Sequence, residues 1–300
     1  MRYVLGFDGG GTKTECVLMD SAGKIIARCF SGPSNPYRVG VESATREIEK
    51  AADLCLQEAR AARNDVAAIG AGLAGTGNPE LKEGMRASIA AAFPGAAVSI
   101  FTDLETALAA AGEGPVIVLV AGTGSAAIGR NAQGEIWRTG GLGFRLGDYG
   151  SAFDIGSRAV ARAMKEREQR GTDSPLGTKI LAQLGYASWR ELQQCASAQP
   201  DDVFPLIFPI VAAAADAADP EAREALSQAA GELSSLVQAV ADHSSLGREN
   251  FGIVKMGGTV GRCAFFDAQL DVALKRIFPA AQISWLQVSP AEAAARAART

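Results

Sequence analysis

Three glycine-rich segments of the 300-residue chain combine bare backbone with hydroxyl side chains. They read DGGGTKT at residues 8–14, AGTGS at 121–125 and MGGTVG at 256–261. Because glycine has no side chain, its backbone N–H group can approach a phosphate closely, and neighbouring threonine and serine hydroxyls add donors. The first two turns therefore predict a site for a triphosphate. The third is by itself equally compatible with a tight turn between a strand and a helix.

Two well-known nucleotide-binding patterns do not fit the first turn. A Rossmann fingerprint requires a helix directly after its glycines, whereas residues 14–20 (TECVLMD) have the composition of a strand. A P-loop ends in Gly-Lys-Ser or Gly-Lys-Thr, and that ending is absent from the sequence. The turn therefore joins two strands. Asp8, at the end of the first of them, adds a carboxylate that can hold Mg²⁺ through water.

The residue patterns around these turns predict one α/β unit that occurs twice. The first copy has predicted strands over 2–8, 14–20, 25–30, 66–74 and 97–102 and predicted helices over 42–63, 79–92 and 104–111. The second has strands over 116–120, 125–130, 135–138, 251–256 and 282–288, an Ala-rich helical stretch over 152–244, and helices over 262–277 and 290–298. The repeat predicts a duplicated fold with a ligand cleft between the copies.

A breaker-rich loop at residues 112–115 separates the two copies. We therefore predict an N-terminal domain over residues 1–113 and a C-terminal domain with a helical insertion over 114–288. The pattern of the last helix, at about 289–300, leaves open whether it packs back onto the first domain.

Composition and charge exclude several classes of function. The chain is 48% hydrophobic and 21% charged with a net charge of −4, and it lacks the basic run that nucleic-acid binding requires. Its longest apolar stretches, at 116–121 and 207–215, are shorter than the roughly 18 to 20 residues of a membrane helix. The apolar run near the N-terminus is too short for a signal peptide. We expect a cytoplasmic protein with no nucleic-acid or membrane partner, either a monomer or a homodimer.

The cysteine and histidine content limits the metal chemistry. Five widely spaced cysteines without a CxxC pair, and the single His243, exclude a disulfide framework, a four-cysteine zinc site and a multi-histidine site. We expect the cysteines to be buried hydrophobic residues and His243 to be a cation at a helix end.

In their order and positions, DGGGTKT, AGTGS and GGT resemble the two phosphate motifs and the adenosine motif of the actin-like ATPase superfamily, which includes sugar kinases. Within it, the chain resembles the BadF/BadG/BcrA/BcrD-type group that includes N-acetylglucosamine kinase. The segments that carry this closer resemblance are SGPSNPYRVG at 31–40, GLAGTGNP at 72–79, TDLETALAAA at 102–111 and GGLGFRLGDYGSAFDIG at 140–156. The resemblance covers essentially the whole chain. It implies two duplicated RNase H-like (actin-like ATPase) domains with an interdomain cleft.

The resemblance also implies an ATP- and Mg²⁺-dependent kinase that phosphorylates a hydroxyl, with the 6-OH favoured, of an amino sugar such as N-acetylglucosamine or glucosamine. Asp103 would be the catalytic base, although an aspartate before a helix also suits an N-cap. Asp8 would hold Mg²⁺. The nucleotide would be bound by Gly9, Gly10, Gly11, Thr12, Lys13, Thr14, Gly122, Thr123, Gly124, Ser125, Ala215, Gly257, Gly258 and Thr259. The sugar would be bound by Asn35, Thr76, Asp103, Gly141, Leu142, Gly143 and Asp148.

The chain departs from the group at two positions of the implied sugar site. Leu142 replaces a frequent aromatic residue and Tyr149 replaces a frequent glutamate, which leaves recognition of an N-acetyl group open. An activator ATPase of a CoA-ester dehydratase or reductase would need cluster-binding cysteines after the second phosphate motif, and residues 121–194 contain none. A non-catalytic sugar sensor is disfavoured because no helix-turn-helix or basic extension is found. The zinc-containing ROK sugar kinases are disfavoured because the chain has one histidine and no clustered cysteines.

Overall fold

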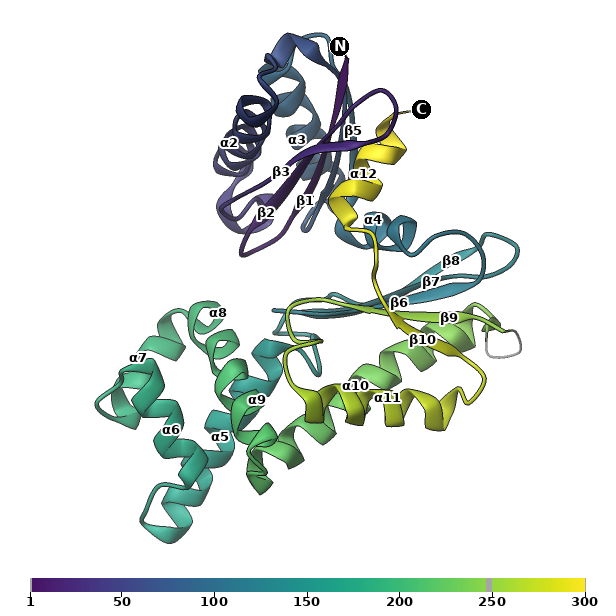
Figure 1. Ribbon diagram of the computed structural model, residues 1–300. Coiled ribbons are helices and arrows are strands. Elements are labelled where there is room, and N and C mark those ends of the chain that lie inside the picture. Colours follow the sequence, from purple (N-terminus) through teal and green to yellow (C-terminus); the bar gives the residue numbers. More distant parts are fainter. Residues whose placement is uncertain (1, 247–249, 300) are drawn as a thin grey trace. The chain divides into compact units, whose positions relative to one another are not determined.

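The computed structural model describes residues 2–246 and 250–299 and divides the chain into two compact units (Figure 1). The first unit runs to Glu113 and resumes at Leu286, and the second unit spans Gly114–Trp285. Each unit is built on one five-stranded sheet. The C-terminal segment of the chain is therefore part of the first unit.

The sheet of the first unit has the strand order β3-β2-β1-β4-β5. Its strands are β1 (Tyr3–Gly9), β2 (Thr14–Met19), β3 (Ile25–Ser31), β4 (Val66–Leu73) and β5 (Ala97–Thr102). β2 is antiparallel to β1 and β3, whereas β4 and β5 run parallel to β1. The carboxyl ends of β1, β4 and β5 therefore lie at one edge of the sheet, which is where ligands bind in open α/β sheets.

Helices α2 (Val41–Ala59) and α3 (Pro79–Ala92) cover one face of this sheet (Figure 1). The apolar positions of α2 recur at helical spacing, and Ile48 and Cys55 are buried in the core that they form with β1, β2 and β3. α2 ends at Ala59, earlier than predicted, because Arg60 takes a left-handed conformation with φ 52°. Two short helices absent from the prediction are α1 (Pro36–Val39) and the 3-10 helix η1 (Arg63–Asp65).

The opposite face is covered by α4 (Asp103–Ala110) and by the C-terminal helix α12 (Pro290–Ala298) (Figure 1). α12 approaches the strands closely because two strand residues have no side chain. A Cβ atom on Gly6 of β1 would lie 2.0 Å from Ala291 O, and one on Gly70 of β4 would lie 2.1 Å from Ala294 O. Ala291 and Ala295 are buried with Val4, Val17 and Met19 in a small core on this face.

The sheet of the second unit has the order β8-β7-β6-β9-β10. Its strands are β6 (Val116–Ala121), β7 (Ser125–Arg130), β8 (Ile136–Gly140), β9 (Gly252–Met256) and β10 (Gln282–Trp285). β7 is antiparallel to β6 and β8, whereas β9 and β10 are parallel to β6. Order and directions repeat those of the first sheet, so the predicted duplication is confirmed. β10 is shorter than the predicted 282–288 because its pairing with β9 ends at Trp285 and Lys255.

The second unit carries most of the helices, and their small residues form a large core with β6 and β9. The helices are α5 (Ala152–Arg170), α6 (Pro175–Leu184), α7 (Trp189–Ala198), α8 (Pro200–Val203), the 3-10 helix η2 (Phe204–Ile207), α9 (Phe208–Asp216), α10 (Pro220–His243) and α11 (Ala264–Ile277). In the described part of the chain, no single helix is long and apolar enough to cross a membrane. Residues 200–216 and α10 reach that length and composition only together, with a bend of 114° between them.

Candidate nucleotide and substrate site

The first glycine-rich turn, between β1 and β2, is held by the loops that follow β3 and β4. Gly10 N donates to Lys13 O at 3.0 Å, and Gly10 O accepts the N–H groups of Ser34 and Asn35 at 3.1 and 3.2 Å. The backbone N–H groups of Gly11 and Thr12 donate to no acceptor within the described residues. Thr12 and Lys13 are also exposed. The turn is thus fixed at its base while its tip keeps free donors, as an anion site requires.

Two of the predicted hydroxyl donors have other partners. Thr14 is fully buried, and its Oγ1 lies 2.7 Å from both Gly32 O and Ser34 Oγ. Thr76 is also buried, and its Oγ1 lies 2.6 Å from Leu73 O and 3.1 Å from Phe101 O. In this structure both hydroxyls hold loops at the sheet edge, and Thr12 is the threonine of the first turn whose side chain reaches solvent. Ser34, which was not predicted as a site residue, holds the first turn through its hydroxyl and its N–H group.

Asp8, near the end of β1, experiences the charges of two other carboxylates, Glu15 of β2 and Asp103 of α4. Burial raises the pKa of Asp8 to about 7, and the charges of Glu15 and Asp103 act in the same direction, whereas Lys13 opposes them. Asp8 is thus costly to ionise until a cation approaches, first because burial removes water from its negative form and second because the neighbouring carboxylates repel it. The cluster draws residues from β1, β2 and the start of α4.

Asp103 is the first residue of α4, and the N-cap of that helix is Thr102. The Thr102 hydroxyl accepts the Glu105 N–H at 3.2 Å, and Glu105 Oε2 accepts the Thr102 N–H at 2.7 Å, which forms a capping box. Asp103 Oδ1 accepts the N–H of its neighbour Leu104 at 3.0 Å, and Asp103 takes no part in this capping box. The capping role considered for Asp103 from the sequence therefore belongs to Thr102.

Asn35 lies against both the first turn and the loop after β4. Its N–H donates to Gly10 O, and its Oδ1 accepts the Tyr37 N–H at 3.0 Å as the N-cap of α1. A Cβ on Gly75, which has φ 85°, would lie 2.3 Å from Asn35 Oδ1. Within the described residues the Asn35 side-chain N–H groups have no acceptor. They remain available to a polar ligand.

In the second unit, the structure brings the second and third glycine-rich turns together. Thr259 N and Thr259 Oγ1 both donate to Ala121 O, at 3.1 and 2.7 Å. A Cβ on Gly257 would overlap Ala121 O at 2.1 Å, so this close approach requires glycine. A Cβ on Gly122 would lie 3.5 Å from Gly258 N, and a Cβ on Gly258 would meet open space. The two backbone segments therefore form one continuous surface, on which Thr123 is half-buried.

Asp148 lies directly beside the second turn. Its carboxylate accepts the Ser125 N–H at 3.4 Å, and the Ser125 hydroxyl donates to Tyr149 O at 2.7 Å. Burial raises the pKa of Asp148, although the N–H groups of Ser125 and Gly143 favour its charged form. Asp148 has a left-handed φ of 61°, which aspartate tolerates better than most residues.

The loop before Asp148 is exposed. Gly141, Leu142 and Gly143 are exposed, and the Leu142 side chain is 65% accessible. Phe144 anchors the loop by stacking on Phe153 of α5, with ring centroids 4.4 Å apart. In contrast, Ala215, the residue expected near adenine, is completely buried in α9.

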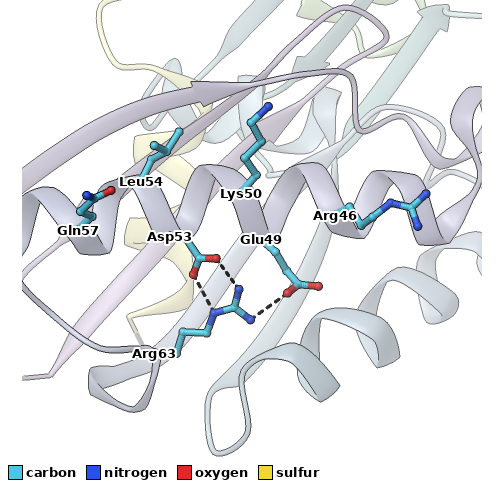
Figure 2. Close-up of a pocket in the computed structure, with 7 residues that line it drawn as sticks. All are labelled: Arg46, Glu49, Lys50, Asp53, Leu54, Gln57 and Arg63. Carbon is cyan, nitrogen blue, oxygen red and sulfur yellow. Dashed lines mark hydrogen bonds and ion pairs between the residues drawn. The ribbon is translucent and has the colours of Figure 1, made fainter.

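A hollow of about 470 Å³ on α2 contains none of the predicted site residues (Figure 2). The Arg63 guanidinium donates to both Asp53 oxygens, at 2.8 and 2.6 Å, and to Glu49 at 2.9 Å. It also lies over the Phe93 ring, 4.9 Å from the centroid. These contacts neutralise Arg63 and tie the end of α2 to the following segment, which is a structural role.

No three His, Cys, Asp or Glu side chains within residues 2–246 and 250–299 are grouped so that they could hold a metal ion alone. A metal at the β1 edge would therefore need ligands beyond the protein side chains. Mg²⁺ commonly binds in this way, through one or two carboxylates, several waters and the phosphates of a substrate.

Comparison with known proteins gives whole-length matches. The model of the "BadF/BadG/BcrA/BcrD ATPase family" matches residues 5–298. The N-acetylmuramic acid/N-acetylglucosamine kinase of Clostridium acetobutylicum is 29% identical over 94% of either chain. The N-acetyl-D-glucosamine kinase of Dictyostelium discoideum is 28% identical over 97% of this chain and 96% of its own.

A solved structure from Chromobacterium violaceum, provisionally assigned as an N-acetylglucosamine kinase, superimposes with a TM-score of 0.80. It is 25% identical and covers 99% of this chain and 98% of its own. The predicted fold, two duplicated α/β domains of the actin-like ATPase type, is therefore confirmed.

Proposed function

The chain belongs to the BadF/BadG/BcrA/BcrD ATPase family, and we propose that it is an ATP-dependent kinase that phosphorylates a hydroxyl of an amino sugar. The observation that carries the proposal is the extent of the similarity to curated amino-sugar kinases, which spans nearly the full length of both chains. Both units, with their separate sets of predicted site residues, are included in that match.

The glycine-rich turns fit the phosphates and ribose of ATP. Free N–H groups at Gly11 and Thr12, and the bare backbone at Gly122 and Gly258, offer donors without side chains in the way. Lys13 adds a positive charge, and it lies over the Phe30 ring, 5.1 Å from the centroid. Such fixed donors do not have to reorganise when charge develops on the transferring phosphoryl group.

The carboxylates at the β1 edge fit one Mg²⁺ ion. Asp8 would hold the ion through water, and the repulsion that Asp8 experiences from Glu15 and Asp103 would be relieved by the positive charge. When bound, Mg²⁺ neutralises the charge of the β- and γ-phosphates. The other steps belong to the protein's own side chains.

Asp103 is the proposed catalytic base. It follows β5 directly, it is half-buried, and Thr102 rather than Asp103 caps α4. As the sugar hydroxyl attacks the γ-phosphorus, Asp103 would accept the hydroxyl proton, and the bond from the γ-phosphorus to the bridging oxygen of ADP would break. The products are the sugar phosphate and ADP. We propose the 6-OH as the acceptor.

The side chains of Asn35 and Asp148 are proposed to orient the sugar. Asn35 offers free N–H donors and Asp148 offers carboxylate oxygens, a combination that suits a ligand with several hydroxyl groups. The exposed Leu142 presents an apolar surface in the loop that precedes Asp148. N-acetylglucosamine, glucosamine and N-acetylmuramic acid are the candidates.

A coupled ADP-release assay with ATP and Mg²⁺ tests this function. The panel is N-acetylglucosamine, glucosamine, N-acetylmuramic acid, N-acetylmannosamine and glucose. We expect ADP release that depends on one or more amino sugars, with phosphate found on the sugar by mass spectrometry. ATP hydrolysis that no sugar accelerates would favour an activator ATPase, and the absence of any turnover would favour a sensor.

Asp103→Asn is the variant that tests the base. Loss of general-base catalysis should lower kcat about 10²- to 10⁴-fold with little change in nucleotide affinity. Glu105→Gln is the matched control, because Glu105 lies in the same helical turn and serves the cap. Near-normal turnover of Asp103→Asn would remove Asp103 from this role.

A further inference from the structure

Arg38, in the single turn of α1, lies against the first glycine-rich turn. A Cβ atom on Gly11 would lie 2.7 Å from Arg38 Nη1 and 3.4 Å from Arg38 Cδ. The outer half of the arginine side chain therefore runs along the backbone of a residue whose N–H group has no acceptor among the described residues. Arg38 is also exposed, so a ligand in solvent can reach its guanidinium.

The backbone before Arg38 fixes the place from which its side chain starts. The segment is tied to the glycine-rich turn, because Gly10 O accepts the N–H groups of Ser34 and Asn35. Asn35 then caps α1 with its Oδ1, and its carbonyl oxygen accepts the Arg38 N–H at 3.0 Å. The Arg38 backbone is therefore held next to the turn, and only the side chain has to adjust when a ligand binds.

The other side chains of this segment point to a different loop. A Cβ atom on Gly75, in the loop after β4, would overlap Asn35 Oδ1 and would lie 3.1 Å from Tyr37 Cβ. Asn35 and Tyr37 thus contact the loop after β4, whereas Arg38 contacts Gly11. The guanidinium therefore belongs to the proposed phosphate site rather than to the proposed sugar site.

The charges around the first turn favour a second cation there. The negative form of Asp8 is opposed by Glu15 and Asp103, and Lys13 is the cation that favours it. Lys13 also lies over the Phe30 ring, 5.1 Å from the centroid. A triphosphate at this turn adds further negative charge. An arginine is suited to neutralise it, because its planar group can donate two parallel hydrogen bonds to phosphate oxygens.

We propose that the Arg38 guanidinium binds phosphate oxygens of ATP, together with the N–H groups of Gly11 and Thr12. The proposal rests on the kinase function above, and it adds a planar cation to a site of backbone donors, the Thr12 hydroxyl and Lys13. It also predicts why glycine is needed at position 11. Gly11 does not have a left-handed φ, so alanine would cause no backbone strain there, but its Cβ would displace the guanidinium.

Binding measured by displacement of a fluorescent ATP analogue, in the presence of Mg²⁺, tests the proposal without turnover. Arg38→Ala should bind ATP and inorganic tripolyphosphate about 5- to 50-fold more weakly, because charge-assisted hydrogen bonds are lost. Adenosine should bind within about twofold of the wild type. Because exposed charges are screened by salt, the loss should shrink between about 0.05 M and about 0.5 M salt. Arg38→Lys, which keeps the charge but loses the planar group, should fall between the two.

Two further variants complete the experiment. Arg46→Ala on α2 is the matched control, since it removes an exposed arginine of the same unit that pairs with Glu42 at 2.6 Å. It should bind tripolyphosphate within about twofold of the wild type. Gly11→Ala should weaken tripolyphosphate binding in the wild type but have a smaller effect in Arg38→Ala, where the displaced group is already absent. A double-mutant cycle measures this coupling.

Four results would overturn the inference. The first is unchanged binding of ATP and tripolyphosphate in a folded Arg38→Ala protein. The second is an equal loss for adenosine, which would indicate a distorted turn. The third is a similar loss in Arg46→Ala, which would indicate a general effect of charge. The fourth is strict additivity of Gly11→Ala and Arg38→Ala. Failure of the kinase function is distinguishable, because a wild-type protein that binds ATP without sugar-dependent turnover would contradict that function alone.

Discussion

The C-terminal helix α12 provides a sharp test of the packing in the first unit, through the substitution Gly6→Ala. An alanine Cβ at this position would lie 2.0 Å from Ala291 O and 2.6 Å from the Ala295 Cβ, whereas ordinary contacts begin at 3.4 Å. α12 would have to retreat by about 1.4 Å. Because α12 also contacts α4, which begins with Asp103, the shift reaches the proposed catalytic base.

The size of the effect is bounded from two directions. Overpacking of a close contact costs about 1–3 kcal/mol. Complete release of α12 would expose the methyl groups of Ala291, Ala294 and Ala295, each fully buried, at about 0.8 kcal/mol per group. Both routes give a loss of about 2 kcal/mol in the free energy of unfolding. For a unit of this size, that corresponds to a fall of about 4–8 °C in the thermal midpoint.

This prediction is tested by measuring the thermal midpoint of unfolding and the hydrogen exchange of the backbone amides. Gly6→Ala should lower the midpoint and increase exchange of the amides in residues 290–298. Gly84→Ala is the control in the same unit, because Gly84 lies inside α3 and its new Cβ would meet only ordinary contacts with Val41. That variant should gain about 0.5–1 kcal/mol. A Gly6→Ala protein as stable as Gly84→Ala, with 290–298 still protected, would refute the packing argument.

Three further predictions concern the proposed site. Gly258→Val should leave stability nearly unchanged, since its Cβ meets open space, but should raise the KM for ATP at least tenfold; an unchanged KM would place the nucleotide elsewhere. Asp8→Asn should abolish most turnover yet stabilise the metal-free protein. The folded pKa of Asp8, about 7, exceeds the ordinary 3.8. Ionisation of Asp8 therefore lowers the free energy of unfolding of the wild-type protein as the pH rises from 4 to 7. The free energy of unfolding that Asp8→Asn gains over the wild type, up to about 4 kcal/mol, should thus be larger at pH 8 than at pH 4.5. Denaturant unfolding of both proteins in EDTA at the two pH values measures this gain. Asp148→Asn should keep the fold, because asparagine tolerates the left-handed backbone. It should raise the KM for the sugar about 10- to 100-fold. An unchanged KM, measured at saturating ATP, would contradict a role of Asp148 in sugar binding.

Local sequence was sufficient to predict the strands and turns that define the fold. Strands such as β1 and β6 contain apolar, β-rich runs, and the glycines at 9–11, 122 and 124 interrupt them at the points where the chain turns. Both signals depend on residues adjacent in the chain, so they are readable without tertiary contacts. The repeated order of strands then indicated the duplication, and the ordered motifs indicated the family.

The roles of individual hydroxyl groups could not be predicted in this way. Thr12, Thr14 and Thr76 all lie in polar, glycine-containing segments, yet Thr14 and Thr76 are buried and donate to backbone carbonyl groups that include those of Gly32 and Phe101, whereas Thr12 is exposed. A hydroxyl bonds to whichever acceptor the fold brings near it. The acceptors Gly32 O and Phe101 O lie 18 and 25 residues away in the chain.

The sequence by itself determined the repeated α/β elements, the glycine-rich turns and the family, because these depend on residue types at short spacing. Tertiary structure alone decided that α12 completes the first unit, since only the pairing of Gly6 and Gly70 with an alanine-lined helix lets the backbones approach. It also decided that Arg38 lies against Gly11. The strands β2 and β3 separate these residues in the chain, and their contact follows from the hydrogen bonds that Gly10 O accepts from Ser34 and Asn35.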